Sequence, residues 1–236
     1  MTTLDAVDAV LIDLDGTLID SRAALTRAWT RWAGEFGVTR EAFEALAAAQ
    51  GTPDRPGNLG QHGRTSASLV AELLPPGVSP EKVRAAIDRI AELEETDVDG
   101  VVALPGAHDL MAALPAGRRA IVTSGTRGVA RARARAAGLP ETLMVTADDV
   151  RHGKPHPEPF LLGAGRLGVP PERCLVLEDA PAGLAAARAA GMRSVALTTN
   201  HPADDLRQAT AIVESLQFLR IGIDGGSLTV TVSKPA

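Results

Sequence analysis

Two aspartates, Asp13 and Asp15, stand two residues apart in the segment LIDLDGTLID, where an apolar run ends. A carboxylate is costly to bury unless a cation or a hydrogen-bond donor compensates its charge. One aspartate of such a pair can act as a nucleophile and carry an aspartyl-phosphate. A second carboxylate two residues away can protonate the leaving oxygen and later take a proton from water. The pair therefore indicates phosphoryl-transfer chemistry.

Further polar residues follow the later predicted strands or lie between them. They are Thr123, Ser124, Gly125, Lys154, Glu178 and Asp179. Ligands of an open parallel sheet bind outside the carboxyl ends of its strands, so we expect these residues to converge with Asp13 and Asp15. Such a concentration of carboxylates needs a cation, and oxygen ligands suit Mg²⁺. Lys154, one of only three lysines in the chain, can neutralise charge that develops on a phosphate.

Short apolar segments predict the strands that position these residues: Ala9–Leu14, Arg119–Thr123, Leu143–Thr146, Leu175–Glu178 and Ser194–Thr198. Alanine-rich helical segments lie between most of them, and Val129–Ala137 and Ala182–Ala190 both lead into a glycine. This alternation predicts an α/β fold, a Rossmann-like parallel sheet with helices on both faces. Near the C-terminus, alternating residues around Asp224-Gly225-Gly226 predict a β-hairpin.

Residues 21–98 break this alternation. Their pattern predicts four helices and no strand: Arg22–Phe36, Arg40–Ala49, Ser66–Leu74 and Pro80–Glu95. A loop rich in glycine and proline, residues 51–63, separates the second helix from the third. Connections between strands are usually far shorter, so an insertion of this length indicates a function. We therefore predict a core of residues 1–20 and 99–236 and an inserted helical cap domain of residues 21–98, which closes over the site and selects the substrate.

Composition narrows the class of protein. A chain of 236 residues that is 45% hydrophobic fits one large domain with an insertion. The net charge of −5 disfavours a nucleic-acid partner, and we interpret one group of arginines as the solvated face of a helix: Arg127, Arg131, Arg133 and Arg135. There is no apolar run long enough to span a bilayer, no basic segment typical of a signal peptide, and a single cysteine, Cys174, in an apolar run. We expect a cytoplasmic protein without a membrane partner, as a monomer or a weak homodimer.

Four ordered segments resemble the motifs of the haloacid dehalogenase superfamily: DLDGTL, VTSGT, GKPHPEPF and LEDAPAGLAAARAAGM. The resemblance spans residues 8–198 and implies a Rossmann-like core with a helical cap of the C1 type. Together with the cap segment HGRTSASL and the C-terminal hairpin, these motifs are similar to the small-sugar and polyol phosphatases of that superfamily. Phosphatases of glycerol-3-phosphate and 2-deoxyglucose-6-phosphate are examples. The resemblance thus implies Mg²⁺-dependent hydrolysis of a small phosphorylated sugar or polyol.

The resemblance also implies a role for each acidic residue and for the lysine. Asp13 is expected to be the nucleophile and a Mg²⁺ ligand. Asp15 is expected to be the general acid and base and to offer its backbone carbonyl to the metal. Lys154 is expected to bridge phosphate and nucleophile. Asp179 is expected to bind Mg²⁺, with Glu178 as a direct or water-mediated partner.

Substrate contacts follow from the same resemblance. Thr123, Ser124 and Gly125 are expected to hold the transferring phosphate. In the cap, Arg64 matches an arginine that relatives use on the substrate, and His62 lies beside it. The identity of the substrate is therefore expected to depend on the loop that carries these two residues.

Several alternatives use the same motifs. A phosphomutase of the β-phosphoglucomutase type shares the core, but its phospho-enzyme must survive until a second substrate hydroxyl arrives. Dehalogenation needs neither a metal nor an acid at position 15, so the presence of Asp15, Glu178 and Asp179 speaks against it. Phosphonate cleavage through a Schiff base needs a cap lysine. The one lysine in the predicted cap, Lys82, stands at a helix start, which is an unconvincing place for that role. A non-catalytic binding protein on this fold is expected to have lost Asp13 or Asp15, and both are present.

Overall fold

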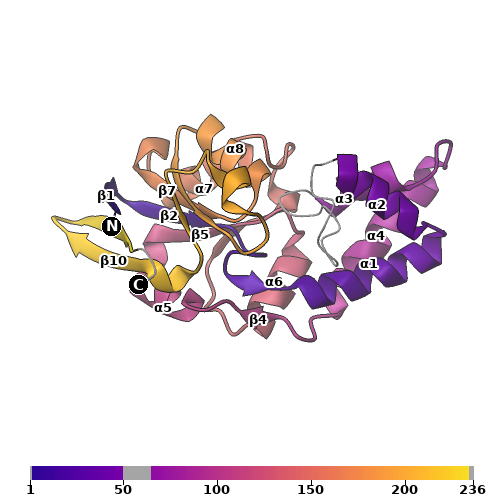
Figure 1. Cartoon of the computed structure of the whole chain (residues 1–236), viewed down its shortest axis with the longest axis horizontal. Coiled ribbons are helices and arrows are strands. Elements are labelled where there is room, and N and C mark those ends of the chain that lie inside the picture. The colour runs from indigo at the N-terminus through magenta and orange to yellow at the C-terminus, as the bar shows by residue number, and fades with distance from the viewer. Residues whose placement is uncertain (1, 50–64, 234–236) are drawn as a thin grey trace.

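The central element is a six-stranded parallel sheet with the strand order β6-β5-β2-β7-β8-β9 (Figure 1). In this computed structural model, residues 2–49 and 65–233 are described. The strands of the sheet are β2 (Ala9–Ile12), β5 (Arg119–Val122), β6 (Leu143–Val145), β7 (Cys174–Glu178), β8 (Arg193–Leu197) and β9 (Ala211–Val213). The sheet and its flanking helices confirm the predicted α/β fold, although β9 was not predicted.

Helices cover both faces of this sheet. They are α5 (Ala107–Ala113), α6 (Arg127–Ala136), α7 (Glu158–Leu167) and α8 (Pro181–Ala189). Successive residues of β2 alternate between the two faces: Val10 and Ile12 pack with α5 and α6, whereas Ala9 and Leu11 pack with α7 and α8. Strands buried on both faces read as continuous apolar runs, which explains why they were predictable. Cys174 is buried in the second of these layers, which agrees with its place in an apolar run.

Four helices form a separate body at one end of the molecule (Figure 1). They are α1 (Arg22–Phe36), α2 (Arg40–Ala49), α3 (Ser66–Leu73) and α4 (Pro80–Thr96). Their apolar faces bury a cluster of their own around Trp29 and Trp32. The Trp29 indole donates to Glu94 Oε1 at 2.8 Å and the Trp32 indole to the Ala86 carbonyl at 2.8 Å, so both buried N–H groups are satisfied.

A short antiparallel pair of strands joins this helical body to the sheet. The chain leaves the sheet through β3 (Ile19–Asp20) and returns through β4 (Val102–Ala103), where Ile19 pairs with Ala103. Both connections therefore lie side by side. Asp20 accepts a hydrogen bond from the Arg22 amide at the start of α1, at 3.1 Å.

The two ends of the described chain pair in a second, antiparallel sheet with the order β1-β11-β10. The predicted hairpin is present as β10 (Leu219–Asp224) and β11 (Ser227–Val232). Its turn residues Gly225 and Gly226 have φ of 54° and 89°, a region that favours glycine. The additional strand β1 (Thr2–Val7), which the sequence pattern did not predict, lies along β11.

Short 3₁₀ turns complete the connections of the core at Ala116–Arg118, Ala147–Asp149, Pro171–Arg173, Ala203–Leu206 and Leu216–Phe218. Among the described residues, none of the helices combines the length and the apolarity that crossing a bilayer requires.

Candidate active site

Three neighbouring strands, β5, β2 and β7, deliver the predicted residues to one edge of the sheet. The residues that directly follow two of these strands are still held by backbone hydrogen bonds. The Asp13 amide donates to the Leu177 carbonyl and the Thr123 amide to the Val145 carbonyl, both at 2.9 Å. The parallel order thus places Asp13, Thr123 and Glu178 at the same carboxyl edge.

Lys154 is the centre of a buried ion cluster at this edge. Its Nζ donates to Asp13 Oδ1 and to Glu178 Oε1, each at 2.6 Å. Burial by itself lowers the pKa of Lys154, but the charges of Asp13 and Glu178 outweigh it, and the pKa is raised. The lysine therefore stays protonated, because the two neighbouring carboxylates stabilise its positive charge.

Three carboxylates surround this one ammonium. Asp13, Glu178 and Asp179 each place a carboxylate oxygen within 4.8 Å of the others, so full ionisation of all three would leave two negative charges without a partner. Burial raises the pKa of Asp13 to about 7, with Lys154 opposing the rise and Glu178 adding to it. Burial, together with Glu178 and Asp13, also raises the pKa of Asp179. The cluster therefore lacks positive charge.

Glu178 has both carboxylate oxygens engaged. Oε1 accepts from Lys154, and Oε2 accepts from the amides of Asp179 and Ala180 at 2.8 Å each. A Cβ atom at Gly183 would lie 1.7 Å from Glu178 Oε1, so glycine is required where α8 passes the glutamate. Through these contacts Glu178 positions the Lys154 ammonium and stabilises the turn after β7.

Asp179 has a partner that the sequence did not predict. Asn200 donates from Nδ2 to Asp179 Oδ2 at 2.7 Å. Gly16, with φ of 89°, lies so near that a Cβ atom there would be 2.2 Å from Asn200 Nδ2. Asn200 follows β8 at the same carboxyl edge, which is the signal that could have identified it.

Asp15 faces the helical body instead. Its Oδ1 accepts from Ser21 Oγ at 2.6 Å and from an Arg133 nitrogen at 3.0 Å. A second nitrogen of Arg133 lies 3.7 Å from Glu94 Oε2 on α4. The sequence predicted Asp15 as a site residue but did not indicate these partners.

The predicted solvated face of α6 is wrong at Arg133. Only 3% of this residue is exposed, because α6 packs against α4 and Arg133 lies at their contact. A buried guanidinium needs carboxylates, and Asp15 and Glu94 supply them. Arg131 and Arg135 are exposed, as predicted.

The predicted phosphate-binding residues lie between β5 and α6. Thr123 is buried, and its Oγ1 accepts from the Gly125 amide at 3.1 Å. Ser124 stands between these two residues, and Thr126 caps α6 by accepting from Val129. This turn and the start of α6 form an environment that favours an anion. The two predicted cap residues, His62 and Arg64, lie outside the described residues.

A doubly covered parallel sheet with this acidic cluster at its carboxyl edge defines a Rossmann-like α/β protein with a separate helical body. The chain belongs to the haloacid dehalogenase-like hydrolases, whose family model matches residues 7–191. This confirms the family to which the four motifs pointed.

Individual relatives agree with this assignment. Hexitol phosphatase A of Escherichia coli is 40% identical over 216 residues, covering 89% of this chain and 92% of that protein. Glycerol-1-phosphate phosphohydrolase 2 of Saccharomyces cerevisiae is 33% identical over 229 residues, covering 92% and 85%. A β-phosphoglucomutase from Clostridium difficile has a TM-score of 0.72 at 23% identity, covering 91% and 93%, and shares the fold.

Proposed function

We propose that this hydrolase is a phosphatase that removes phosphate from a small sugar or polyol phosphate through an aspartyl-phosphate on Asp13. The observation that carries the proposal is the buried cluster in which Lys154 contacts both Asp13 and Glu178 at 2.6 Å. The similarity to a hexitol phosphatase and to a glycerol-1-phosphate phosphohydrolase supports a small sugar or polyol phosphate as the substrate. β-Phosphoglucomutase stays the alternative, but its likeness concerns the fold alone.

In the proposed first step, an Asp13 oxygen attacks phosphorus and the bond to the leaving oxygen breaks. Lys154 holds Asp13 by its Oδ1 and offsets negative charge as the phosphate approaches. Thr123, Ser124 and Gly125 hold the phosphate oxygens at the start of α6. Water then attacks the aspartyl-phosphate, releasing phosphate and restoring Asp13.

The acidic cluster fits a divalent cation, since it offers oxygen donors and, when fully ionised, two negative charges without a partner. Asp13 and Asp179 would hold Mg²⁺, with the backbone carbonyl of Asp15. Both oxygens of Glu178 already accept hydrogen bonds, which favours a water-mediated role for it. When bound, Mg²⁺ supplies charge that offsets the repulsion between a carboxylate nucleophile and a phosphate.

Asp15 is the proposed general acid and base, which protonates the leaving oxygen and then takes a proton from water. Ser21 and Arg133 both bind its Oδ1, so the other carboxylate oxygen is the one that carries the proton. Arg133 acts as a positioning residue because it contacts Asp15 and approaches Glu94 of the helical body.

We also propose that residues 21–98 act as a cap domain over the core formed by residues 1–20 and 99–236. The paired strands β3 and β4 would be its hinge. Thr65, which caps the N-terminus of α3, lies beside the Lys154 segment, because a Cβ atom at Gly153 would be 3.2 Å from Thr65 Cγ2. Arg64 directly precedes Thr65 and His62 lies two residues before Arg64, and we propose that both contact the sugar or polyol.

The decisive experiment measures phosphate release from a panel of hexitol, hexose and glycerol phosphates, with and without EDTA. We expect Mg²⁺-dependent release that Asp13→Asn abolishes. Parallel analysis of the organic product distinguishes the alternative, since isomerised sugar phosphate without phosphate release would replace the phosphatase by a mutase. Size-exclusion chromatography and cell fractionation test the predicted monomer or weak homodimer and the cytoplasmic location.

A further inference from the structure

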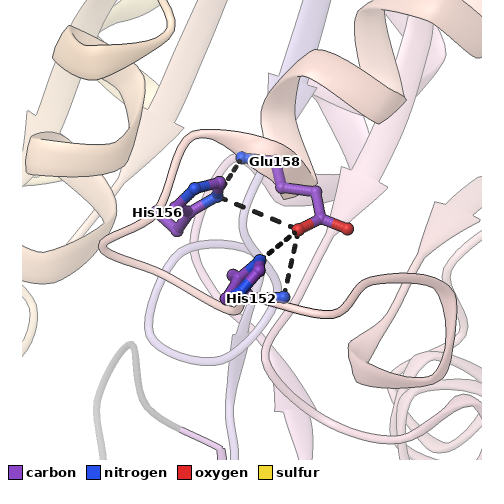
Figure 2. A group of neighbouring side chains, drawn as sticks. All are labelled: His152, His156 and Glu158. Atoms are coloured by element: carbon purple, nitrogen blue, oxygen red, sulfur yellow. Dashed lines mark hydrogen bonds and ion pairs between the residues drawn. The ribbon is translucent and has the colours of Figure 1, made fainter.

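A second group of metal-ligating side chains lies on the surface, in the segment that carries Lys154. It consists of His152 and His156, which flank the lysine in the sequence, and Glu158 at the start of α7. The two imidazole rings lie with centroids 4.7 Å apart. Figure 2 shows both rings turned toward the Glu158 carboxylate.

The donor atoms of this group converge on one point. His152 Nδ1 lies 3.0 Å from Glu158 Oε2, and His156 Nδ1 lies 3.9 Å from the same oxygen. The ligands of a tetrahedral zinc ion stand about 3.3 Å apart at the usual bond lengths. The two separations from Glu158 Oε2 lie on either side of this value, and all three ligand atoms lie within 4.8 Å of one another, so rotation of these exposed side chains would bring them to bonding positions.

Neighbouring contacts orient the Glu158 carboxylate and set the acceptor role of His156. The Arg151 amide donates to Glu158 Oε1 at 2.9 Å and the His152 amide to Oε2 at 3.1 Å, so the backbone orients this carboxylate. These hydrogen bonds, of which that from the Arg151 amide has the largest effect, lower the pKa of Glu158 and so keep its carboxylate ionised. The Glu158 amide donates to His156 Nδ1 at 3.2 Å, so this nitrogen is an acceptor, and its lone pair becomes available to a metal when the ring turns away from that amide.

We propose that His152, His156 and Glu158 form a second metal site that takes a borderline divalent transition metal such as Zn²⁺. Two imidazole nitrogens and one carboxylate oxygen suit this class of ion better than Mg²⁺, which prefers oxygen ligands. The exposure of both histidines leaves a fourth position for water. This site is distinct from the acidic cluster, from which it takes no residue.

Occupation of this site would brace the segment that carries Lys154. A metal bound by His152, His156 and Glu158 closes residues 152–158 into a loop across the lysine. The ion stabilises the folded state, since the unfolded chain does not hold the three ligands together. The site does not depend on the proposed phosphatase activity.

The test is calorimetric titration of the whole protein with Zn²⁺ in excess Mg²⁺, with thermal unfolding as a second measurement. We expect one Zn²⁺ per chain and a higher melting temperature. His152→Ala, His156→Ala and Glu158→Gln should each weaken binding about tenfold or more, since even loss of an outer partner costs that much. His108→Ala, outside the cluster, is the matched control and should bind as the wild type does.

Two results would overturn the proposal. One is equal zinc affinity of the wild type and the His152→Ala/His156→Ala variant. The other is zinc binding that disappears with Asp179→Asn but persists in the double histidine variant, because the ion would then occupy the acidic cluster. Unfolding curves without zinc show whether each variant is folded, and His152 and His156 are exposed enough for the substitutions to be tolerated.

Discussion

The two aspartates of the opening motif belong to two different regions of the molecule. Asp13 lies in a cluster built entirely by the sheet and its loops, with Lys154 and Glu178 as close partners. Asp15 lies at the boundary with the helical body, held by Ser21 before α1 and by Arg133 on α6. The proposed nucleophile is thus fixed by the core alone, whereas the proposed acid and base depends on contacts that adjoin the helices.

The first prediction concerns Asp13, the aspartate that the core alone holds in place. Asp13→Asn should lower kcat about 10⁴-fold or more on every substrate, because no other carboxylate can form the covalent intermediate. Phosphate release measured at saturating substrate checks this. Retention of more than a hundredth of the activity would contradict the assignment of Asp13.

The second prediction concerns Asp15, the aspartate at the boundary with the helical body. Asp15→Asn should lower kcat about 10²–10⁴-fold on a sugar phosphate, the usual contribution of general acid–base catalysis. Formation of the aspartyl-phosphate from p-nitrophenyl phosphate should suffer much less, since nitrophenolate leaves without protonation. A burst of nitrophenol in rapid-mixing experiments measures it. Equal losses in that step on both esters would show that Asp15 does not act as the acid.

The third prediction tests whether the boundary contacts position Asp15. Arg133→Met should lower kcat about tenfold, leave KM nearly unchanged, and shift the pH profile of kcat that Asp15 governs. It should also destabilise the fold by about 3–5 kcal/mol, because it leaves Glu94 buried without its cation. The two effects are therefore expected together in the single variant.

A second substitution separates these effects. Arg133→Met/Glu94→Gln should recover much of the stability, since no unpaired buried charge remains beside α4. Activity should stay low, because Asp15 still lacks its partner. Full recovery of activity in the double variant would indicate that Arg133 serves only the fold.

The smallest expected effect is the pH dependence of the unfolding free energy that arises from the neighbouring buried carboxylates of the core. The pKa of Asp13 is raised to about 7 by burial, so below that pH the folded state binds a proton that the unfolded state releases near pH 4. Without metal, this group lowers the unfolding free energy as pH rises from about 4 to about 7, with little change above. At pH 7.5 in EDTA, Asp13→Asn should therefore be more stable than the wild type by about 1 kcal/mol or more.

Thermal unfolding in EDTA and in Mg²⁺ provides the measurement for this prediction. Added Mg²⁺ should stabilise the wild type more than Asp13→Asn, because the cation relieves a repulsion that the variant has already lost. A wild type that is the more stable protein in EDTA at pH 7.5 would contradict the excess of negative charge inferred for the cluster.

Much of the fold was predictable because its signals are local. The buried strands of the parallel sheet read as apolar runs, and α1 and α2 have the predicted bounds. The strands β1, β3, β4 and β9 were missed for a common reason. They are short or carry charged residues, and each is defined by a partner distant in the sequence, as Thr2 is by Val232.

The candidate site divides in the same way. The sequence by itself was enough to predict one common site for six residues, because each lies in a motif at the end of a predicted strand or in the loop between two of them: Asp13, Asp15, Thr123, Lys154, Glu178 and Asp179. Tertiary structure alone decided that Asn200 reaches Asp179 and that Arg133 is buried between Asp15 and Glu94. An arginine on a helix looks the same in sequence whether it faces water or another helix. Its partners, and hence its charge environment, come only from the packing of α6 against α4.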